Sequence, residues 1–186
     1  MIHLLALVAV LQKHPKKPPV QAKPPILQVH KNFLPVKKTI RDSTNNYIVI
    51  HNDGASLNVS ATRLVLRLRR LAYHYFIGRD GKITQFVDLK YEAPHAGVSS
   101  WHGMTNWNMF SIGVCLQGTD WTDYTEKQYA SLKKLVHYIN IRYPDSKEKP
   151  ILGHRDVASP AGRKSDPGDH FELWRLYDDT TNYPRG

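Results

Sequence analysis

Cysteine is almost absent from this chain of 186 residues, which contains only Cys115. A single cysteine excludes an internal disulfide and a cysteine-rich zinc site, so histidine and aspartate would have to bind any metal. The cysteine content therefore leaves the cellular compartment open. At this length one compact domain can bury a sizeable core without disulfide support.

Long apolar runs are missing too. The apolar run near the N-terminus covers residues 4–11 and is much shorter than the ~20 residues that cross a bilayer. It has the length of a signal-peptide core, but no lysine or arginine precedes it and no clean Ala-x-Ala site follows it. An export signal and a packed N-terminal element both remain open, and we expect no transmembrane span.

Acidic residues are scarce, with 16 Asp and Glu against 26 Lys and Arg, for a net charge of +10. Part of this charge lies in a proline-broken, lysine-rich stretch over residues 12–38, which is typical of an extended linker. Such an arm is either simply solvated or attracted to a polyanion such as an acidic cell envelope. Aromatic residues do not alternate with its lysines, which disfavours nucleic acid. We therefore expect an arm over residues 1–39 and a folded domain over residues 40–186.

Several short apolar runs predict strands. Residues 47–50 form a β-branched and aromatic run typical of a strand buried on both faces, and a turn signal follows, so His51 lies at a strand end. Residues 73–77 and 83–87 are joined by an Asp-Gly turn and predict a hairpin. Residues 111–116 predict another core strand.

Two patterns predict helices. Ser60 can cap a helix through about Leu71, whose apolar stripe would contain Ala61, Leu64, Val65, Leu68 and Leu71. Residues 125–128 match a capping box and open a helix to about residue 143, where Pro144 stops it. Residues 88–110 form a long irregular segment. Strands interleaved with helices predict an α/β fold, a single domain with a central mixed β-sheet flanked by helices.

The segment over residues 150–171 contains the largest group of candidate functional residues. His154 follows a strand-like run, and a loop rich in proline and glycine then contains Lys164 and Asp166. His51 also ends an apolar strand, and ligand sites of α/β proteins gather at such ends. Zinc accepts both His nitrogen and Asp oxygen. Separations of 103 and 12 residues are not a signature, so spacing alone leaves a zinc triad and ordinary packed side chains both open.

Five sequence blocks in one order carry a family resemblance. They are IVIHND at 48–53, YHYFIGRDGKI at 73–83, APHAG at 93–97, NMFSIGVCLQG at 108–118 and GHRDV…GRKSDPG at 153–168. Together they resemble the zinc-dependent N-acetylmuramoyl-L-alanine amidases, a group that includes phage lysozyme-amidases and animal peptidoglycan recognition proteins. The resemblance covers about residues 45–175 and leaves out the N-terminal arm.

The resemblance implies one zinc ion held by His51, His154 and Asp166. Three protein ligands leave a fourth position for water, whose pKa zinc lowers towards ~7. Lys164 matches the family's catalytic lysine, which could neutralise the oxyanion formed when an amide carbonyl is attacked. Tyr73 matches a tyrosine of the phage branch, placed to hydrogen-bond the water or the intermediate.

The resemblance also implies a substrate groove. His95, Trp101 and Asn108 lie in the segment that would line it. Asn108 is expected to bond the stem-peptide backbone, and Trp101 is expected to pack on a sugar, although a purely structural role for Trp101 is equally open. Arg155 is a candidate for a peptide carboxylate.

One position departs from many bacterial members. Cys115 stands where they carry a glutamate that can act as general base, and the phage branch also has cysteine there. A buried neutral thiol is a poor base, so the identity of the general base is open. The loop from His154 to Asp166 is also longer than is usual in the family.

These residues predict a peptidoglycan hydrolase that cleaves the amide between N-acetylmuramic acid and L-alanine. We expect a monomer that acts on the cell wall, secreted, periplasmic or delivered by a phage, with an endolysin-like or antibacterial role. The alternative is a non-catalytic module that recognises muropeptides, and the presence of all three candidate ligands favours the enzyme. A third possibility is nucleic-acid binding through the basic arm, which predicts affinity that collapses with salt.

Overall fold

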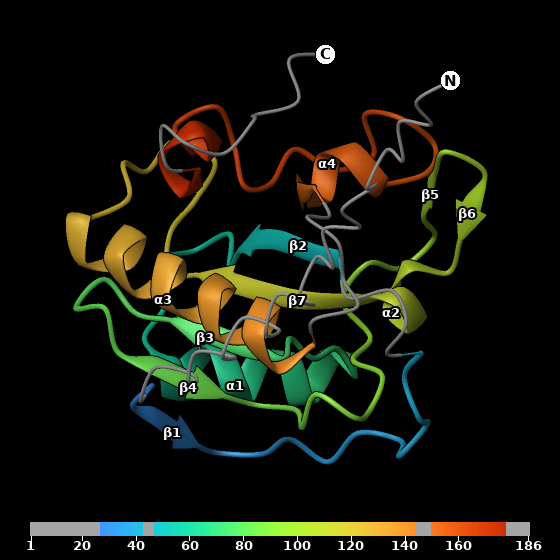
Figure 1. Ribbon diagram of the computed structural model, residues 1–186, viewed down its shortest axis with the longest axis horizontal. Coiled ribbons are helices and arrows are strands. Elements are labelled where there is room, and N and C mark those ends of the chain that lie inside the picture. Colours follow the sequence, from blue (N-terminus) through green and yellow to red (C-terminus); the bar gives the residue numbers. More distant parts are fainter. Residues whose placement is uncertain (1–26, 43–46, 144–149, 178–186) are drawn as a thin grey trace, which may run out of the picture.

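A computed structural model describes residues 27–42, 47–143 and 150–177 (Figure 1). In these residues a six-stranded sheet has the order β1-β4-β3-β7-β2-β8, and β5 and β6 form a separate two-stranded ribbon. The strands are β1 (Val29–Lys31), β2 (Tyr47–Asn52), β3 (Tyr75–Ile77), β4 (Ile83–Gln85), β5 (Ser100–Trp101), β6 (Met104–Thr105), β7 (Ser111–Leu116) and β8 (Ile151–Gly153).

The six-stranded sheet is mixed, as the sequence predicts. Only β3 and β4 pair antiparallel, as the hairpin that the Asp-Gly turn indicates. The other pairs in the sheet are parallel, including β2 with β7 and β2 with β8. Parallel strands need both faces covered. Five of the six residues of β2 and all six of β7 are buried, which satisfies that need.

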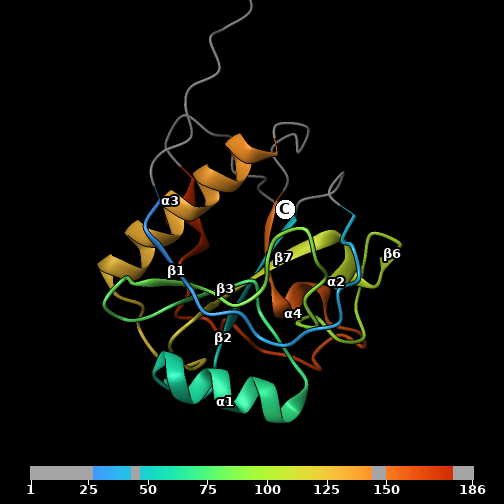
Figure 2. The same cartoon turned by 90° about the horizontal axis from the view of Figure 1, so that it is seen from below.

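The two faces of the sheet pack against different helices. Alternate residues of the central strands, among them Ile50 and Val114, join α3 (Glu126–Arg142) in the larger core cluster. On the other face Phe76 and Cys115 pack with Leu66 of α1 (Val59–Arg69). Figure 2 shows α3 and α1 on opposite sides of the strands. Because side chains alternate along a strand, His51 shares the α1 face with Cys115.

The helix α3 begins as predicted. The Thr125 hydroxyl accepts a hydrogen bond from the Gln128 backbone at 3.1 Å, and the Gln128 side chain accepts one from the Thr125 backbone at 3.0 Å. This reciprocal capping box satisfies two backbone donors at the start of the helix. The helix buries its apolar side with Tyr129, Leu132, Leu135 and Ile139. Pro144, the expected stop signal, lies outside the described residues.

The helix α1 corrects two predictions. Its cap is Asn58 and not Ser60, because the Asn58 Oδ1 accepts from the backbone nitrogens of residues 60 and 61 at 3.1 and 3.0 Å. The helix also turns a different side to the core, where Thr62 and Leu66 are its buried residues. The predicted stripe is therefore wrong as a core face, and its three leucines are exposed: Leu64 by 56%, Leu68 by 74% and Leu71 by 41%.

The folded unit begins earlier than the sequence suggested. The strand β1 pairs parallel with β4, and Leu34 is buried. The extended linker predicted over residues 12–38 is therefore wrong for its last part, which adds an edge strand to the sheet ahead of the expected boundary at residue 40. Residues 1–26, with the apolar run and most of the arm, lie outside the described residues.

The remaining elements are short. The strand β3 starts at Tyr75, two residues later than expected, and β4 ends at Gln85. The segment 88–110, predicted to be irregular, contains β5, β6 and α2 (Trp107–Phe110). The last elements of the described residues are α4 (His154–Val157) and the 3-10 turn η1 (Leu173–Leu176). None of the described helices is long and apolar enough to cross a bilayer.

Candidate active site

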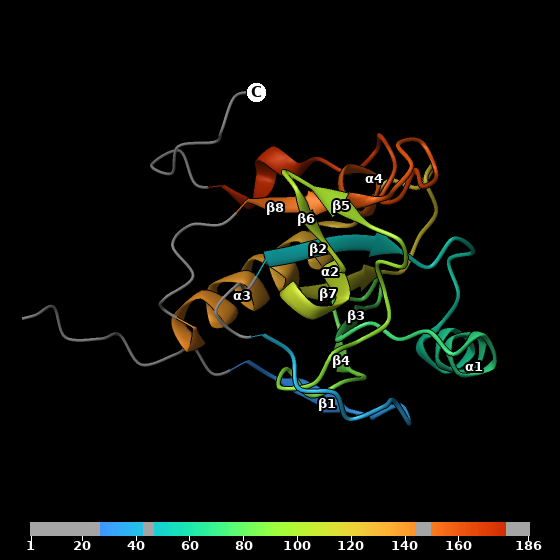
Figure 3. The ribbon, with the colours of Figure 1, turned by 90° about the vertical axis from the view of Figure 1, so that its right-hand side faces the viewer.

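The sheet brings the three predicted ligands to one place. His51 is the fifth residue of β2, and His154 is the first residue of α4, directly after β8. Because β2 and β8 are neighbouring parallel strands, their carboxyl ends meet at one edge (Figure 3). Asp166 reaches the same point from the following loop. One ligand atom from each of the three residues lies within 4.8 Å of the others, so the cluster could hold a metal ion.

A chain of hydrogen bonds fixes the proton positions on His51. The Ser111 hydroxyl lies 2.5 Å from the Trp107 carbonyl oxygen, and a carbonyl can only accept, so the hydroxyl donates there. Ser111 Oγ must therefore accept from His95 Nε2, 3.2 Å away. This leaves His95 Nδ1 as an acceptor, and His51 Nε2 donates to it over 2.9 Å. His51 Nδ1 then carries a lone pair towards Asp166.

The same reasoning applies to His154. Its Nε2 lies 3.1 Å from the Ala96 carbonyl oxygen and donates to it, so in the neutral ring its Nδ1 carries the lone pair. The Asp166 carboxylate lies 3.0 Å from His51 Nδ1 and 3.1 Å from His154 Nδ1. When both rings are neutral, two imidazole nitrogens and a carboxylate face one another as acceptors. A bound cation, or a proton taken up by one of the rings, relieves the repulsion among them, and the N,N,O set suits zinc.

The surroundings of His51 and Asp166 favour the protonation states that a metal needs. Burial of the His51 ring lowers its pKa to about 4, although a hydrogen bond that the protonated ring would donate to Asp166 opposes the change. Burial acts to raise the pKa of Asp166, but the hydrogen bonds that protonated His154 and His51 rings donate to the carboxylate outweigh burial and hold the pKa below its ordinary value. At neutral pH His51 is neutral and Asp166 is ionised, as metal ligands must be.

Contacts from several elements hold the loop around Asp166. The Pro167 carbonyl accepts from the Tyr124 hydroxyl at 2.8 Å and from Asn52 Nδ2 at 3.3 Å. Gly168 has a positive φ of 84°, and a Cβ there would lie 2.3 Å from the Asp120 carbonyl oxygen. A larger residue would therefore push the loop, and Asp166 with it, away from the strand ends.

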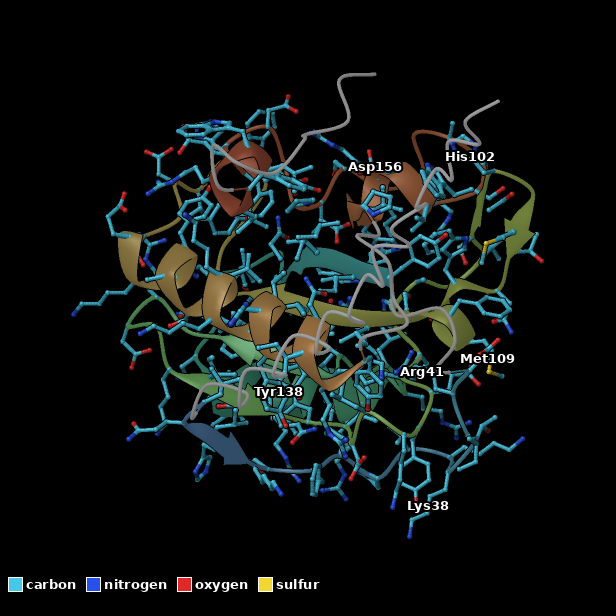
Figure 4. All side chains as sticks on the ribbon, in the orientation of Figure 1. Lys38, Arg41, His102, Met109, Tyr138 and Asp156 are labelled. Carbon is cyan, nitrogen blue, oxygen red and sulfur yellow. The ribbon has the colours of Figure 1, made fainter. Side chains whose placement is uncertain are left out.

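The start of α4 is fixed in a similar way. Asp156, labelled in Figure 4, accepts from the Gly153 backbone nitrogen at 2.6 Å through its Oδ2. The Arg155 backbone nitrogen donates to the Asp166 carbonyl at 3.0 Å. The short helix and the ligand loop are therefore joined by a backbone bond beside His154.

The three residues expected to influence the chemistry differ in exposure. The Tyr73 ring lies 4.9 Å from the His51 ring, and burial raises its pKa well above the ordinary value, so its hydroxyl stays protonated. Cys115 is fully buried, and burial raises the pKa of its thiol. Lys164 is exposed. The charge of Lys164 also lowers the pKa of His51, although burial and the interactions with Asp166 and His154 have larger effects.

Two residues expected in the groove support the cluster. His95 is only 6% exposed and lies behind His51 as its hydrogen-bond acceptor. The Asn108 Oδ1 accepts from the backbone nitrogens of His95 and Ala96 at 2.9 and 2.7 Å. Asn108 thus positions the segment that contacts both His51 and His154. The substrate-binding roles of His95 and Asn108 stay predictions.

The other two groove candidates lie nearer the surface. Trp101 is partly buried, with its ring 6.0 Å from that of Tyr47 and 5.6 Å from that of Trp107. Arg155 is exposed and forms an ion pair with Asp169. Packing of Trp101 leaves part of its ring accessible, and a ligand carboxylate would have to compete with Asp169 for Arg155. Their roles also stay predictions.

Sequence reasoning missed Ser111 and Asn52. Ser111 ends the hydrogen-bond chain behind His51, and Asn52 holds the loop that follows Asp166. The available signal was their polarity within buried apolar strands, because a buried polar side chain needs a specific partner.

Comparison with known proteins identifies the family. Residues 41–169 match the family profile described as N-acetylmuramoyl-L-alanine amidase. The chain belongs to the N-acetylmuramoyl-L-alanine amidase family. It is 42% identical over 108 residues to the 1,6-anhydro-N-acetylmuramyl-L-alanine amidase AmpD of Haemophilus influenzae, a match covering 58% of this chain and 57% of that protein. With the amidase AmiD of Escherichia coli it shares 30% identity over 145 residues, covering 69% of this chain and 51% of AmiD.

Solved structures of the amidase family have the same fold. A selenomethionine AmpD crystal structure matches with a TM-score of 0.66 and 30% identity, over 80% of this chain and 92% of that one. An AmiD complex with an anhydro-N-acetylmuramic acid peptide matches with a TM-score of 0.63 and 27% identity, over 72% of this chain and 56% of that one. The chain spans a little over half the length of the AmpD proteins that it matches in sequence.

Proposed function

We propose that this amidase-family chain is a zinc-dependent hydrolase that cleaves the amide bond between N-acetylmuramic acid and L-alanine. The observation that carries the proposal is the convergence of His51 Nδ1, His154 Nδ1 and an Asp166 oxygen, each placed as an acceptor by contacts of its own residue. With neutral rings three facing acceptors repel one another, and a bound cation removes that repulsion.

Each residue of the cluster has a part in the proposed reaction. His51, His154 and Asp166 would hold the ion, which when bound supplies Lewis-acid polarisation of the amide carbonyl and a water of lowered pKa. The exposed Lys164 ammonium stabilises the negative charge that develops on the carbonyl oxygen. The Tyr73 hydroxyl stays protonated and donates a hydrogen bond to the same oxygen.

Cys115 takes no proton in this scheme, because burial keeps its thiol neutral. Asp166 is held in its ionised form and faces both metal-ligand histidines, which occupies its oxygens. Lys164 is the exposed ammonium of the proposed machinery, so we assign it the transfer of a proton to the leaving amine. Solvent takes up the proton of the attacking water and returns one to Lys164.

We propose that soluble muropeptides carrying an anhydro-muramic end are among the substrates. AmpD of Haemophilus influenzae is named as an amidase for 1,6-anhydro-N-acetylmuramyl-L-alanine, and the AmiD structure contains an anhydro-muramic peptide. Intact cell-wall peptidoglycan is the second substrate class of the proposal. The monomeric state, the secreted, periplasmic or phage-delivered location and the endolysin-like role stay predictions from sequence.

The test is mass analysis of products from purified peptidoglycan and from anhydro-muropeptides. We expect free L-alanine amino termini, loss of release after chelation, and recovery on adding zinc. Undiminished release in excess chelator would refute zinc dependence, and cleavage at another bond would refute the specificity. A protein that binds muropeptides but neither holds zinc nor cleaves them would be the recognition module instead.

A variant separates chemistry from metal binding. We expect Lys164→Met to lower kcat by roughly 10²–10³-fold, the usual effect of removing one oxyanion donor, with zinc content unchanged because Lys164 is not a ligand. Lys134→Met is the matched control, because Lys134 is an exposed lysine of α3, which packs on the other face of the sheet from His51. Equal loss in both variants would show that the effect does not depend on the position of Lys164.

A further inference from the structure

The solvent-facing side of α1 contains apolar residues, whereas a surface helix usually has polar residues on that side. Leu64 and Leu68 are spaced by four residues and share one face of the helix. Each lies two residues from the buried Leu66, which corresponds to about 200° around a helix. Leu71 follows the Arg70 C-cap and is also exposed, so three of the eight large apolar side chains that are exposed in the described residues lie on this face or directly after it. We call it the leucine face.

No described segment covers the leucine face. Figure 2 shows α1 at the edge of the molecule, with the sheet on one side only. Leu68 is 74% exposed and Leu64 is 56% exposed. Exposed apolar side chains that occur singly need no explanation, but a contiguous stripe on one helix marks an interaction surface.

The helix is strongly basic. Between Asn58 and Leu71 the sequence has four arginines and no acidic residue. Arg67 and Arg69 lie in its last turn, and Arg70 is its C-cap. These arginines flank the leucines, so the surface combines an apolar stripe with a basic border that attracts anions.

The surface continues beside the helix. The Arg63 Nη2 donates to the Phe33 carbonyl at 3.1 Å, and the Phe33 side chain is 46% exposed. A cleft of about 650 Å³ lies between the end of α1 and the segment after β1, lined by apolar Leu34, Val36 and Leu71 and by basic Lys37, Arg67 and Arg70. Apolar and basic side chains therefore lie together on both elements, and Glu92 is the acidic residue in the cleft lining.

We propose that the leucine face binds a lipid bilayer that carries anionic headgroups. A helix lying in such an interface buries its apolar side among the acyl chains while its basic residues contact the lipid phosphates. A second copy fits less well, because a symmetric contact through α1 would place its four arginines against the same arginines of the partner. Without an acidic residue on the helix, nothing on α1 would neutralise them.

The experiment places a fluorescent probe at the leucine face of the full-length protein. Cys115 is fully buried, so Leu68→Cys gives one accessible thiol for an environment-sensitive dye. The matched control is Val98→Cys, because Val98 is also apolar and similarly exposed, 72% against 74%. Figure 3 places the β5–β6 ribbon, which follows Val98, away from α1.

The labelled proteins are mixed with phosphatidylcholine vesicles with and without phosphatidylglycerol. We expect a blue shift for the dye at position 68 with anionic vesicles only, weakening with salt, and none at position 98. Bound protein with no shift at position 68, or with equal shifts at both positions, would overturn the proposal and assign binding to another segment. A shift at position 68 without vesicles that grows with protein concentration would also overturn it, in favour of self-association.

A second variant tests the leucines without a dye. We expect Leu64→Ser with Leu68→Ser to lower partition into anionic vesicles by roughly tenfold or more, because two exposed leucines no longer enter the interface. These side chains are exposed, so the fold should hold, and circular dichroism checks it. Unchanged partition of the folded double variant would overturn the proposal, since the N-terminal arm is intact in it.

Discussion

At the scale of single residues, Ser111 decides which nitrogen of His51 carries the lone pair at the candidate metal site. Ser111→Ala removes the acceptor for His95 Nε2, so the proton on His95 is free to move to Nδ1 and His51 loses the partner that fixes its ring. We expect zinc affinity to fall by about 10–100-fold, the usual effect of losing such support. Competition with a chromophoric chelator measures it.

Ser131→Ala is the control for this prediction. The Ser131 hydroxyl donates to the Gly81 carbonyl at 2.6 Å, far along the chain from the ligands, so its loss should affect stability without affecting zinc. Equal zinc affinity in Ser111→Ala and in the native protein would show that His51 keeps its orientation without the hydrogen-bond chain.

The candidate metal ligands and the residues that support them differed in how well their positions could be predicted. His51, His154 and Asp166 follow from motif resemblance, because each lies in a block with a fixed residue pattern. The role of His95 behind His51 does not, since it depends on which atoms meet across β7 and the segment before it. A proton position is set by three-dimensional partners, and a sequence does not specify them.

At the scale of elements, the cap of α1 gives a matched pair of substitutions. We expect Asn58→Ala to lower the free energy of unfolding by about 1 kcal/mol, because the Asn58 side chain accepts from two backbone nitrogens at the helix start. Ser60→Ala should change it little, since alanine favours a helix interior. Urea unfolding of both variants measures the difference, and a larger loss for Ser60→Ala would contradict the observed cap.

The same helix shows where pattern reasoning fails. The stripe through Leu64, Leu68 and Leu71 is the more apolar one, yet Thr62 and Leu66 face the sheet. Helical spacing identifies a face but not what lies against it. The strands β2 and β7 were easier to predict, because continuous apolar runs that are buried on both sides leave no choice of face.

At the scale of the whole molecule, buried neutral histidines make stability depend on pH. The rings of His51, His74 and His95 are all buried, and burial lowers the pKa of each, to about 3 for His74. The unfolded chain takes up protons on these residues below pH ~6.5, and the folded chain does not. Stability from these groups is therefore complete above that pH and is lost as the pH falls towards the folded values.

His74 lets this effect be measured away from the metal ligands. Its Nδ1 accepts from the Gly113 backbone nitrogen at 3.1 Å and its Nε2 donates to the Tyr91 carbonyl at 3.0 Å, and a glutamine side chain can make both kinds of bond without titrating. For the metal-free protein between pH 6 and pH 5, we expect His74→Gln to reduce the loss of unfolding free energy by roughly 1 kcal/mol. An identical pH slope in the variant and the native protein would mean that His74 is protonated in the folded state. That result would contradict the hydrogen bond in which His74 Nδ1 accepts from the Gly113 backbone nitrogen.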